Sequence, residues 1–546
     1  MKKPKSMARF LPTAAALIVL VLATSRASVA SDPSSAEVRK IDSRLEMFID
    51  HYLIDRMEGG ANLKLHAPVF KGMVLSFDNP WEGACTGFVT VIKDGDLYRM
   101  YYIGLPLRVL SDYEDTTFSY AESRDGITWT KPNLGLVDYN GSKNNNILLA
   151  WDRKEGYVHN LSPFLDTRPG VPPSERFKAV GSGNNGWPER LLYTLASPDG
   201  IHWKKLGVSD KFPLGRFDTQ NTAFWSETEQ RYVLFCREYI PSDPVWDLAR
   251  RLAEDKPGSK IPIRNRGLDY TWRHSDGFRT IVKATSTDAI HWENQQRMSF
   301  GNTPMEELYT FHATPYFRAP YLIVGTPMRY VPHRSAMTQK EYEGIKIHPL
   351  YANESTQAEF AGNSPMRNEV SDTVLITSRG GFRFDRTFME GFVRPGLDIR
   401  NWVSRNGMAA TGLIQTGPDE MSLYVQQHYA QPSAGIGRYA IRLDGFASVN
   451  APYSGGEFVT KPLVFQGSEL VLNVSTSAAG SVSVELQDQD GEPIPGYTLE
   501  EAEVIVGDRI ERPVVWRAGD LKQFSGRPMR LRFVMKDADL YSIRFR

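Results

Sequence analysis

The chain has 546 residues, with 64 basic and 64 acidic side chains, 41% hydrophobic residues and two cysteines. This length exceeds what one hydrophobic core usually organises, so we expect two domains or one large repeat array. The balanced charge argues against a nucleic-acid-binding protein, which needs a cationic face. Cys85 and Cys236 are too few for a disulfide scaffold or a four-thiolate zinc site, although they could pair with each other after export.

The first 30 residues have the layout of a secretory signal peptide. Basic residues precede an apolar run at 11–23, and the small residues Ser28 and Ala30 follow it. The run is shorter than the roughly 20 residues that cross a bilayer, so we expect cleavage after Ala30 and no membrane span afterwards. Cleavage leaves 59 basic against 64 acidic groups. We therefore expect a mildly acidic, exported protein, either periplasmic or extracellular.

The segment that follows the signal has a helical pattern. Val38, Ile41, Leu45, Ile49 and Leu53 recur at the spacing of one helix face. This pattern predicts a short N-terminal helix that packs outside the main domain.

An internal repeat is the most informative feature of the chain. The motif Ser-x-Asp-Gly/Ala-Ile-x-Trp stands at residues 123–129, 197–203 and 286–292, and a degenerate copy stands at 378–384. Asp-Gly at such a place predicts a tight turn, because glycine accepts positive φ and aspartate can bond its own backbone. We therefore expect a structural role for these aspartates.

Strand-like runs accompany the turns. Each turn directly follows an alternating, strand-like run. A second strand-like run stands before that one, and this second series has five members. These five lie at 97–102, 176–181, 231–236, 320–325 and 422–429. Five similar units that close radially would form a five-bladed β-propeller, which leaves few strand edges exposed.

The repeated turn resembles the Asp-box of sialidases and related propellers. The count of five resembles instead the five-bladed glycosidases, the superfamily that contains glycoside hydrolase families 32 and 43, over roughly residues 64–450. The resemblance implies a central funnel in which carboxylates cleave a glycosidic bond. The superfamily pattern of an Asp, an Asp and a Glu in the first three blades does not transfer cleanly, because the second blade offers Asn160, with Asp166 further along.

The remainder of the chain changes pattern after residue 450. Short alternating runs separated by turns predict a β-sandwich at 451–546. The proline-rich stretch 241–270 predicts a long loop inserted in the third blade, of the kind that often rims a binding site. The expected fold is therefore all-β, divided into a signal peptide at 1–30, a helical segment at 31–63, a propeller at 64–450 and the sandwich.

Candidate active-site residues come from the segments that should enter each blade at the funnel. Hydrolysis of a glycosidic bond needs a proton donor and a second carboxylate. The candidate acids are Asp78, Glu82, Asp218, Glu307 and Glu390. The candidate substrate-binding residues are Trp81, Asn160, Asn221, Tyr309, His312, Arg329, Arg394 and Arg405. The three arginines could grip an anionic sugar, or they could be paired with blade carboxylates.

These residues predict a secreted glycoside hydrolase that acts on a polysaccharide or oligosaccharide, including an anionic one. Two alternatives stay open: a non-catalytic carbohydrate-binding propeller, and a sialidase-like exo-hydrolase in which Tyr309 acts with a nearby glutamate. No His-Glu-x-x-His or Gly-x-Ser-x-Gly motif is present. We expect no required cofactor and no metal, since nothing in the sequence indicates the structural calcium ion that such a fold could hold. The oligomeric state stays open.

Overall fold

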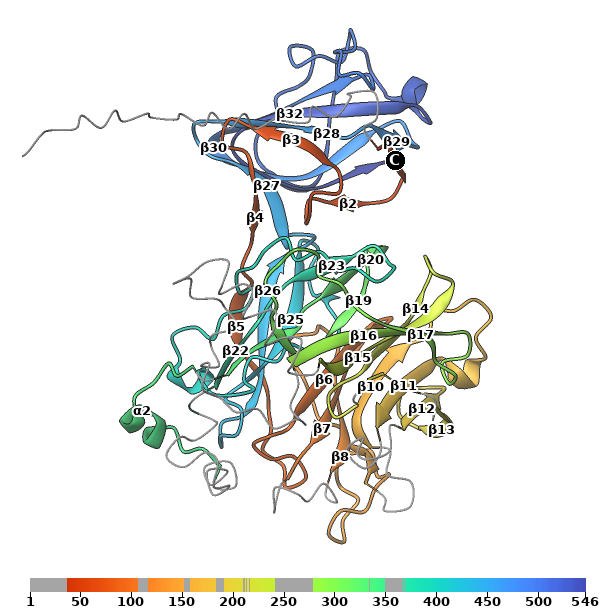
Figure 1. Ribbon diagram of the computed structural model, residues 1–546, viewed down its shortest axis with the longest axis vertical. Coiled ribbons are helices and arrows are strands. Elements are labelled where there is room, and N and C mark those ends of the chain that lie inside the picture. The colour runs from red at the N-terminus through yellow and green to blue at the C-terminus, as the bar shows by residue number, and fades with distance from the viewer. Residues whose placement is uncertain are drawn as a thin grey trace, which may run out of the picture.

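Figure 1 shows a computed structural model of the chain. The structure describes residues 37–106, 116–151, 158–182, 191–209, 212, 214–215, 217–240, 278–332, 334–348, 367 and 369–546. The predicted signal peptide and the proline-rich stretch 241–270 lie outside these residues. Within the described residues the fold is all-β, with one α-helix, α2 (Gln339–Gly344), and short 3-10 turns at η2 (Pro173–Glu175), η6 (Ile399–Asn401) and η7 (Lys522–Phe524).

Three antiparallel four-stranded sheets follow one another along the first part of the chain. The first contains β6 (Gly87–Asp94), β7 (Leu97–Gly104), β8 (Thr117–Ser123) and β9 (Ile147–Ala150). The second contains β10 (His159–Leu165), β11 (Phe177–Ser182), β12 (Leu192–Ser197) and β13 (Lys204–Ser209). The third contains β14 (Thr222–Ser226), β15 (Arg231–Ile240), β16 (Phe278–Ser286) and β17 (Glu293–Arg297).

The fourth unit is split into two small sheets, and the fifth borrows a strand from the beginning of the chain. The fourth unit pairs β19 (Ala313–Tyr316), β20 (Ala319–Gly325) and β23 (Ile376–Ser378), and separately β18 (Glu307–Thr310), β21 (Met328–Pro332) and β22 (Glu369–Thr373). The fifth sheet orders β24 (Ile414–Gln415), β25 (Glu420–Gln427), β26 (Gly435–Arg442) and β5 (Val69–Ser76). Because β5 precedes the first sheet, its pairing with β26 joins the two ends of the series.

One strand from each of the five units lies near a common axis. β6 contacts β10 and β24, β10 contacts β14, and β14 contacts β19. The later residues of all five strands also line a single cavity of about 560 Å³. The earlier residues of these strands therefore lie at the other end of the axis, which we call the entry end.

The three repeated turns have one hydrogen-bond pattern. In the first, Ser123 Oγ donates to Asp125 Oδ1 at 2.8 Å, and the same oxygen accepts from the backbone N–H groups of Ile127 and Thr128, both at 2.7 Å. These N–H bonds lower the pKa of Asp125 to about 2. The aromatic residue that ends the motif packs against a neighbouring sheet, as Trp129 does on Tyr424 of β25. Turn chemistry and inter-sheet packing thus account for the motif.

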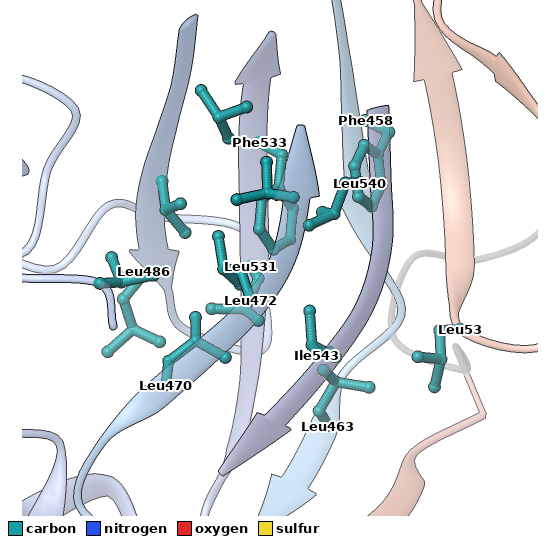
Figure 2. Packing of buried hydrophobic residues seen from close by; sticks show 14 of the residues in the cluster. Leu53, Phe458, Leu463, Leu470, Leu472, Leu486, Leu531, Phe533, Leu540 and Ile543 are labelled. Atoms are coloured by element: carbon teal, nitrogen blue, oxygen red, sulfur yellow. The ribbon is translucent and has the colours of Figure 1, made fainter. Parts of the chain in front are cut away.

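A second body lies at one end of the molecule, joined to the five units through β4 (Asn62–Leu65) and β27 (Ala447–Ala451) (Figure 1). Its strands from the end of the chain are β27 (Ala447–Ala451), β28 (Gly456–Thr460), β29 (Leu463–Phe465), β30 (Leu470–Gln487), β31 (Asp508–Pro513) and β32 (Pro528–Phe545). β30 and β32 pair along most of their length, with register breaks near Asn473 and between Thr476 and Ser481. Figure 2 shows Leu472, Leu531 and Phe533 in the core of this body, with Leu53 contributed from the beginning of the chain.

The predicted N-terminal helix is wrong. This region forms four strands, β1 (Arg39–Asp42), β2 (Glu46–Met47), β3 (Ile54–Glu58) and β4 (Asn62–Leu65), all paired with strands of the second body. Ile41 and Leu53 are buried as the helical pattern requires, but in the core of that body. Pairing with β28, β29 and β32 outweighs the local periodicity, because most helical stability comes from tertiary packing.

The entrance to the fifth sheet also differs from the prediction. Residues 388–394 and 401–405 lie in turns and a 3-10 segment, and the first strand of the sheet is β24, at 414–415. No disulfide joins Cys85 and Cys236, which are buried in two different core clusters. Among the described residues, no helix is long and apolar enough to cross a membrane.

Candidate active site

The third sheet carries two arginines and a tyrosine on an extension toward the entry end. β14 pairs with β15 only as far as Phe235, whereas β15 and β16 continue to pair through Ile240 and Phe278. This two-stranded extension places Tyr239 directly opposite Arg279. Arg237 and Tyr239 are two residues apart on β15, so their side chains share one face of the strand.

The sheet of β18, β21 and β22 in the fourth unit supplies the side chains that face these arginines. Glu307 is paired with Tyr330, and Tyr309 lies two residues after Glu307 on the same strand. The rings of Tyr309 and Tyr330 are 5.7 Å apart. We call Arg237, Tyr239, Arg279, Tyr309 and Tyr330 the arginine–tyrosine cluster.

Both arginines lie over the same tyrosine ring. The Cζ atoms of Arg237 and Arg279 are 5.0 and 5.4 Å from the ring centroid of Tyr309, within the range of cation–π contacts. They are also 5.3 and 5.7 Å from the ring centroid of Tyr239. The cluster is therefore one continuous surface contributed by two sheets.

Two of the predicted acids form ion pairs with these arginines. Asp218 Oδ1 is 2.5 Å from Arg237 Nη2, and Glu307 Oε2 accepts a hydrogen bond from Arg279 Nη1 at 2.7 Å. The Asp218 side chain is 43% exposed and that of Glu307 only 4%. The structure thus brings together, from separate segments, one accessible and one buried carboxylate.

The pKa shifts follow from burial and from the opposite charges. Burial lowers the pKa of Arg237, but the Asp218 carboxylate and the neighbouring tyrosines more than offset it, so the pKa lies above its usual value. The same balance, with Glu307 as the main partner, raises the pKa of Arg279. Burial and then the Glu369 carboxylate raise the pKa of Tyr330. Both arginines are therefore fixed cations at any pH at which the protein is folded.

A second group of polar side chains lies near the axis at the entry end. Asn160 and Asn221 both direct an amide N–H to the carbonyl oxygen of Phe217, at 3.5 and 3.4 Å. Gln220 reaches across the axis and donates to Thr90 Oγ1 at 2.9 Å. Since Thr90 also lines the cavity of about 560 Å³, Gln220 lies between that cavity and the entry end.

Several of these buried groups have hydrogen-bonding capacity left over. Within the described residues, the side-chain oxygens of Asn160, Gln220 and Asn221 and both ring nitrogens of His312 contact no protein partner. Burial lowers the pKa of His312 to about 3, so its imidazole is neutral at physiological pH. Buried polar atoms are normally hydrogen-bonded, so these groups are suited to water or to the hydroxyl groups of a ligand.

The cavity at the other end of the axis has a different character. Its walls are mainly apolar, with Phe164, Trp225, Pro315 and Tyr316 among them, and none of the predicted acids lines it. Its size suits a ligand, but Glu227 is the one carboxylate among its lining residues, whereas glycoside hydrolysis needs two. The candidate active site is therefore the arginine–tyrosine cluster and the adjoining entry end.

Two of the predicted arginines, Arg405 and Arg329, have different surroundings. Arg405 lies near Tyr330 and acts on its pKa together with Glu369 and Arg279. Arg329 is held by Asp372, with Nε donating to Oδ1 at 2.8 Å, and by Glu306 at 2.7 Å. Pairing of Arg329 with carboxylates is the second of the two roles that the sequence left open.

Three predicted acids and one predicted arginine lie elsewhere. Arg394 and Glu390 are exposed on the turns after β23. Asp78 and Glu82 bind Lys131 Nζ at 3.0 and 2.8 Å. Asp78 and Lys131 line a pocket together with Trp81, and β10, β14, β18 and β19 contribute no residue to it. The structure therefore leaves Asp218 and Glu307 as the predicted acids at the cluster.

Sequence reasoning missed Arg237, Tyr239, Arg279, Tyr330 and Glu369. Each is on a second or third strand of its sheet or on the small sheet, whereas the search followed the segments expected to enter each blade. The one available signal was length, because the strand-like run at 231–236 continues to Ile240 before the proline-rich stretch begins.

No metal centre is indicated in the part of the chain that the structure describes. There, no group of three or more His, Cys, Asp or Glu side chains could hold an ion. The carboxylates of the cluster are bound to arginines, which leaves them poor ligands for a cation.

The chain matches no family model and no curated protein sequence. Among solved structures, it is similar to a glycoside hydrolase with 11% identity over 69% of this chain and 92% of that one, at a TM-score of 0.42. It is similar to an N-acetylgalactosamine deacetylase from F. plautii (12% identity, 70% and 96% covered, TM-score 0.42). It is also similar to an exo-β-1,3-galactanase from Phanerochaete chrysosporium (8% identity, 88% and 99% covered, TM-score 0.35). At these identities and TM-scores the similarities say nothing about the activity of this chain.

Proposed function

We propose that the chain is an exported glycoside hydrolase that cleaves an oligosaccharide or polysaccharide at the arginine–tyrosine cluster. Its scaffold in this proposal is a five-bladed β-propeller with a C-terminal β-sandwich. The five consecutive units, the contacts of one strand from each unit around an axis and the closure by β5 support the propeller. The N-terminal basic and apolar pattern supports export.

One observation carries the activity. Asp218 is paired with Arg237 and Glu307 with Arg279, and both arginines lie over the ring of Tyr309. Glycoside hydrolysis needs one carboxyl group that protonates the leaving oxygen and a second that activates water or attacks the sugar carbon. The exposed Asp218 is open to substrate, while Glu307 is buried among tyrosines. The partly exposed Tyr309 offers an aromatic ring for the sugar, and His312 and the asparagines offer unpaired hydrogen-bonding atoms.

The charge of the substrate follows from the pairing at the cluster. Arg237 and Arg279 are paired with Asp218 and Glu307, so the charges of these four groups balance. A neutral oligosaccharide is therefore the substrate that we favour. An anionic sugar is the narrower proposal, because its carboxylate would have to replace Asp218 as the partner of Arg237.

A sialidase-like mechanism is the second candidate. Tyr309 and Glu307 both contact Arg279, and Tyr309 also lies against Arg237, an arrangement that suits a tyrosine nucleophile with a glutamate base. Replacement of Tyr309 by phenylalanine separates the two mechanisms, because only the second loses its nucleophile.

The test is a screen of neutral and anionic glycans with the wild type, Asp218→Asn, Glu307→Gln and the matched control Glu390→Gln. We expect the first two variants to lose about 10²- to 10⁴-fold in kcat, the size of a lost general acid or base. The control, exposed and outside the cluster, should keep full activity. Thermal unfolding checks that Glu307→Gln, which leaves Arg279 without its charge partner, remains folded.

Equal turnover by all four proteins would overturn the assignment of the site. Binding of a glycan by the wild type without any turnover would instead favour the carbohydrate-binding propeller. Amino-terminal sequencing of protein recovered outside the cytoplasm tests export, and a first residue of Ser31 is the expected result.

A further inference from the structure

A polar pocket of about 450 Å³ lies at the outer side of the first sheet, apart from the candidate active site. It is formed by the end of β5, by the turn at 78–81 and by residues 129–146, which connect β8 to β9. We call it the Trp81 pocket. Its volume falls within the range of about 300–1,000 Å³ that small-ligand sites occupy.

The indole of Trp81 is held in place by the first sheet. Trp81 Nε1 donates to Asn146 Oδ1 at 2.8 Å, and Asn146 Nδ2 donates to the hydroxyl of Tyr102 at 2.7 Å and to the carbonyl of Tyr120 at 2.6 Å. The ring of Tyr139 meets it edge to face at 5.9 Å. An aromatic side chain that is fixed in this way loses little conformational entropy when a ligand binds.

Two of the lining residues, Lys131 and Asp78, belong to an ionic network with the buried Glu82. Lys131 Nζ donates to Ser76 O at 2.6 Å, to Glu82 Oε2 at 2.8 Å and to Asp78 Oδ1 at 3.0 Å, which uses all three of its N–H groups. Glu82 is fully buried and accepts further bonds from Tyr102 OH at 2.7 Å and from the backbone N–H of Asn79 at 2.9 Å. One cation against two carboxylates leaves a net charge of −1.

The rim of the pocket carries groups that are available to a ligand. Asn133 and Asn144 line it and are exposed, and no protein partner of their side-chain amides occurs in the described part of the chain. The Asp78 side chain is 75% exposed and uses one oxygen for Lys131. The rim therefore offers amide donors and acceptors and one further carboxylate oxygen around the indole.

We propose that the Trp81 pocket is a second, non-catalytic binding site for a neutral saccharide. A fixed indole face beside two amides and a carboxylate matches a molecule with an apolar ring face and hydroxyl groups at its edges. The net negative charge disfavours uronate, sulfate and phosphate ligands. The site does not depend on the activity proposed for the arginine–tyrosine cluster.

Affinity electrophoresis of the full chain tests this inference, with galactan, arabinan, mannan or xylan in the gel, and polygalacturonate as the anionic comparison. We expect at least one neutral polymer, and not polygalacturonate, to retard the wild type. Trp81→Ala and Asn144→Ala should each weaken the apparent affinity, about tenfold for the tryptophan. Asn144 is exposed, so its variant stays interpretable even if Trp81→Ala unfolds.

Asp218→Asn removes the proposed hydrolytic carboxylate, and Glu390→Gln, which is exposed and outside both sites, is the matched control that should keep the full retardation. The inference is overturned if no neutral polymer retards the wild type, or if both pocket variants are retarded as strongly as the wild type. Loss of retardation in Asp218→Asn would also overturn it, by moving the binding to the arginine–tyrosine cluster.

Discussion

Individual side chains show how an acid can look catalytic in sequence and prove structural. Asp166, the acid that the sequence offers beyond Asn160, directly follows the first strand of the second sheet. Its Oδ2 atom instead accepts from Lys178 Nζ at 2.6 Å and from Tyr232 OH at 2.6 Å, and both charged groups are buried. A carboxylate that is held in this way links β11 to β15 and does not face solvent.

Removal of the cation from this pair should destabilise the protein strongly. Lys178→Met leaves Asp166 as a buried, unpaired carboxylate, so we expect the free energy of unfolding to fall by about 3–5 kcal/mol. Urea unfolding followed by tryptophan fluorescence measures it. The double variant Lys178→Met/Asp166→Asn removes both charges and should recover part of the loss. An equal loss in single and double variants would contradict the pairing argument.

Some contacts of the candidate site can be predicted from the sequence and others cannot. Tyr309 and Glu307 both contact Arg279, although a register break between Leu308 and Thr310 interrupts the alternation that their spacing of two predicts. Arg237 and Arg279 are 42 positions apart and meet only because β15 and β16 pair beyond the end of β14. Their partnership with Asp218 and Glu307 depends on how two sheets lie beside each other, which no local pattern records.

Secondary-structure elements show a similar contrast between local pattern and tertiary pairing. The second and third strands of the sheets follow the predicted runs closely, because β-branched and aromatic residues fit the middle of a sheet. The N-terminal segment has the spacing of a helix and forms strands. Phe48, between β2 and β3, is fully buried and meets the rings of Phe458 and Phe533 edge to face, at 5.2 and 6.4 Å.

This contact makes the N-terminal segment a stabilising part of the second body. Phe48→Ala should lower the free energy of unfolding by about 3–5 kcal/mol, because it leaves a cavity in the core. Val38→Ala is the matched control, since Val38 is 46% exposed, and its effect should stay within about 0.5 kcal/mol. Differential scanning calorimetry can follow both variants. Equal effects would mean that the segment does not belong to this core.

At the scale of the whole molecule, Asp444 joins the fourth and fifth sheets to the second body. It accepts from Tyr316 OH at 2.6 Å and from Arg318 Nη1 at 2.8 Å, and Asn473 of β30 donates to it at 3.5 Å. Burial raises the pKa of Asp444, although Arg318 and the hydrogen bonds act in the opposite direction. The protonated form is therefore favoured by folding.

The sign of the resulting pH dependence follows from this raised pKa. The stabilisation is complete below the ordinary carboxyl pKa of about 4 and is lost as the pH rises through the higher value of the folded state. We therefore expect the free energy of unfolding of the wild type to fall relative to that of Asp444→Asn as the pH rises from 4 to about 8. Urea titrations at several pH values measure the difference. A difference that is independent of pH would contradict the shift.

The sequence by itself determined the periodic part of this protein: the all-β class, the repeated turns and the middle strands of the sheets. These follow from residue preferences that act over a few positions, such as the Ser-Asp-Gly turns and the alternating runs. Only the tertiary structure decided which distant segments pair: the N-terminal strands with the second body, β5 with β26, and two buried arginines with Asp218 and Glu307. Such pairings depend on long-range packing and on the free-energy cost of a buried charge that has no partner. Neither leaves a local pattern in the chain.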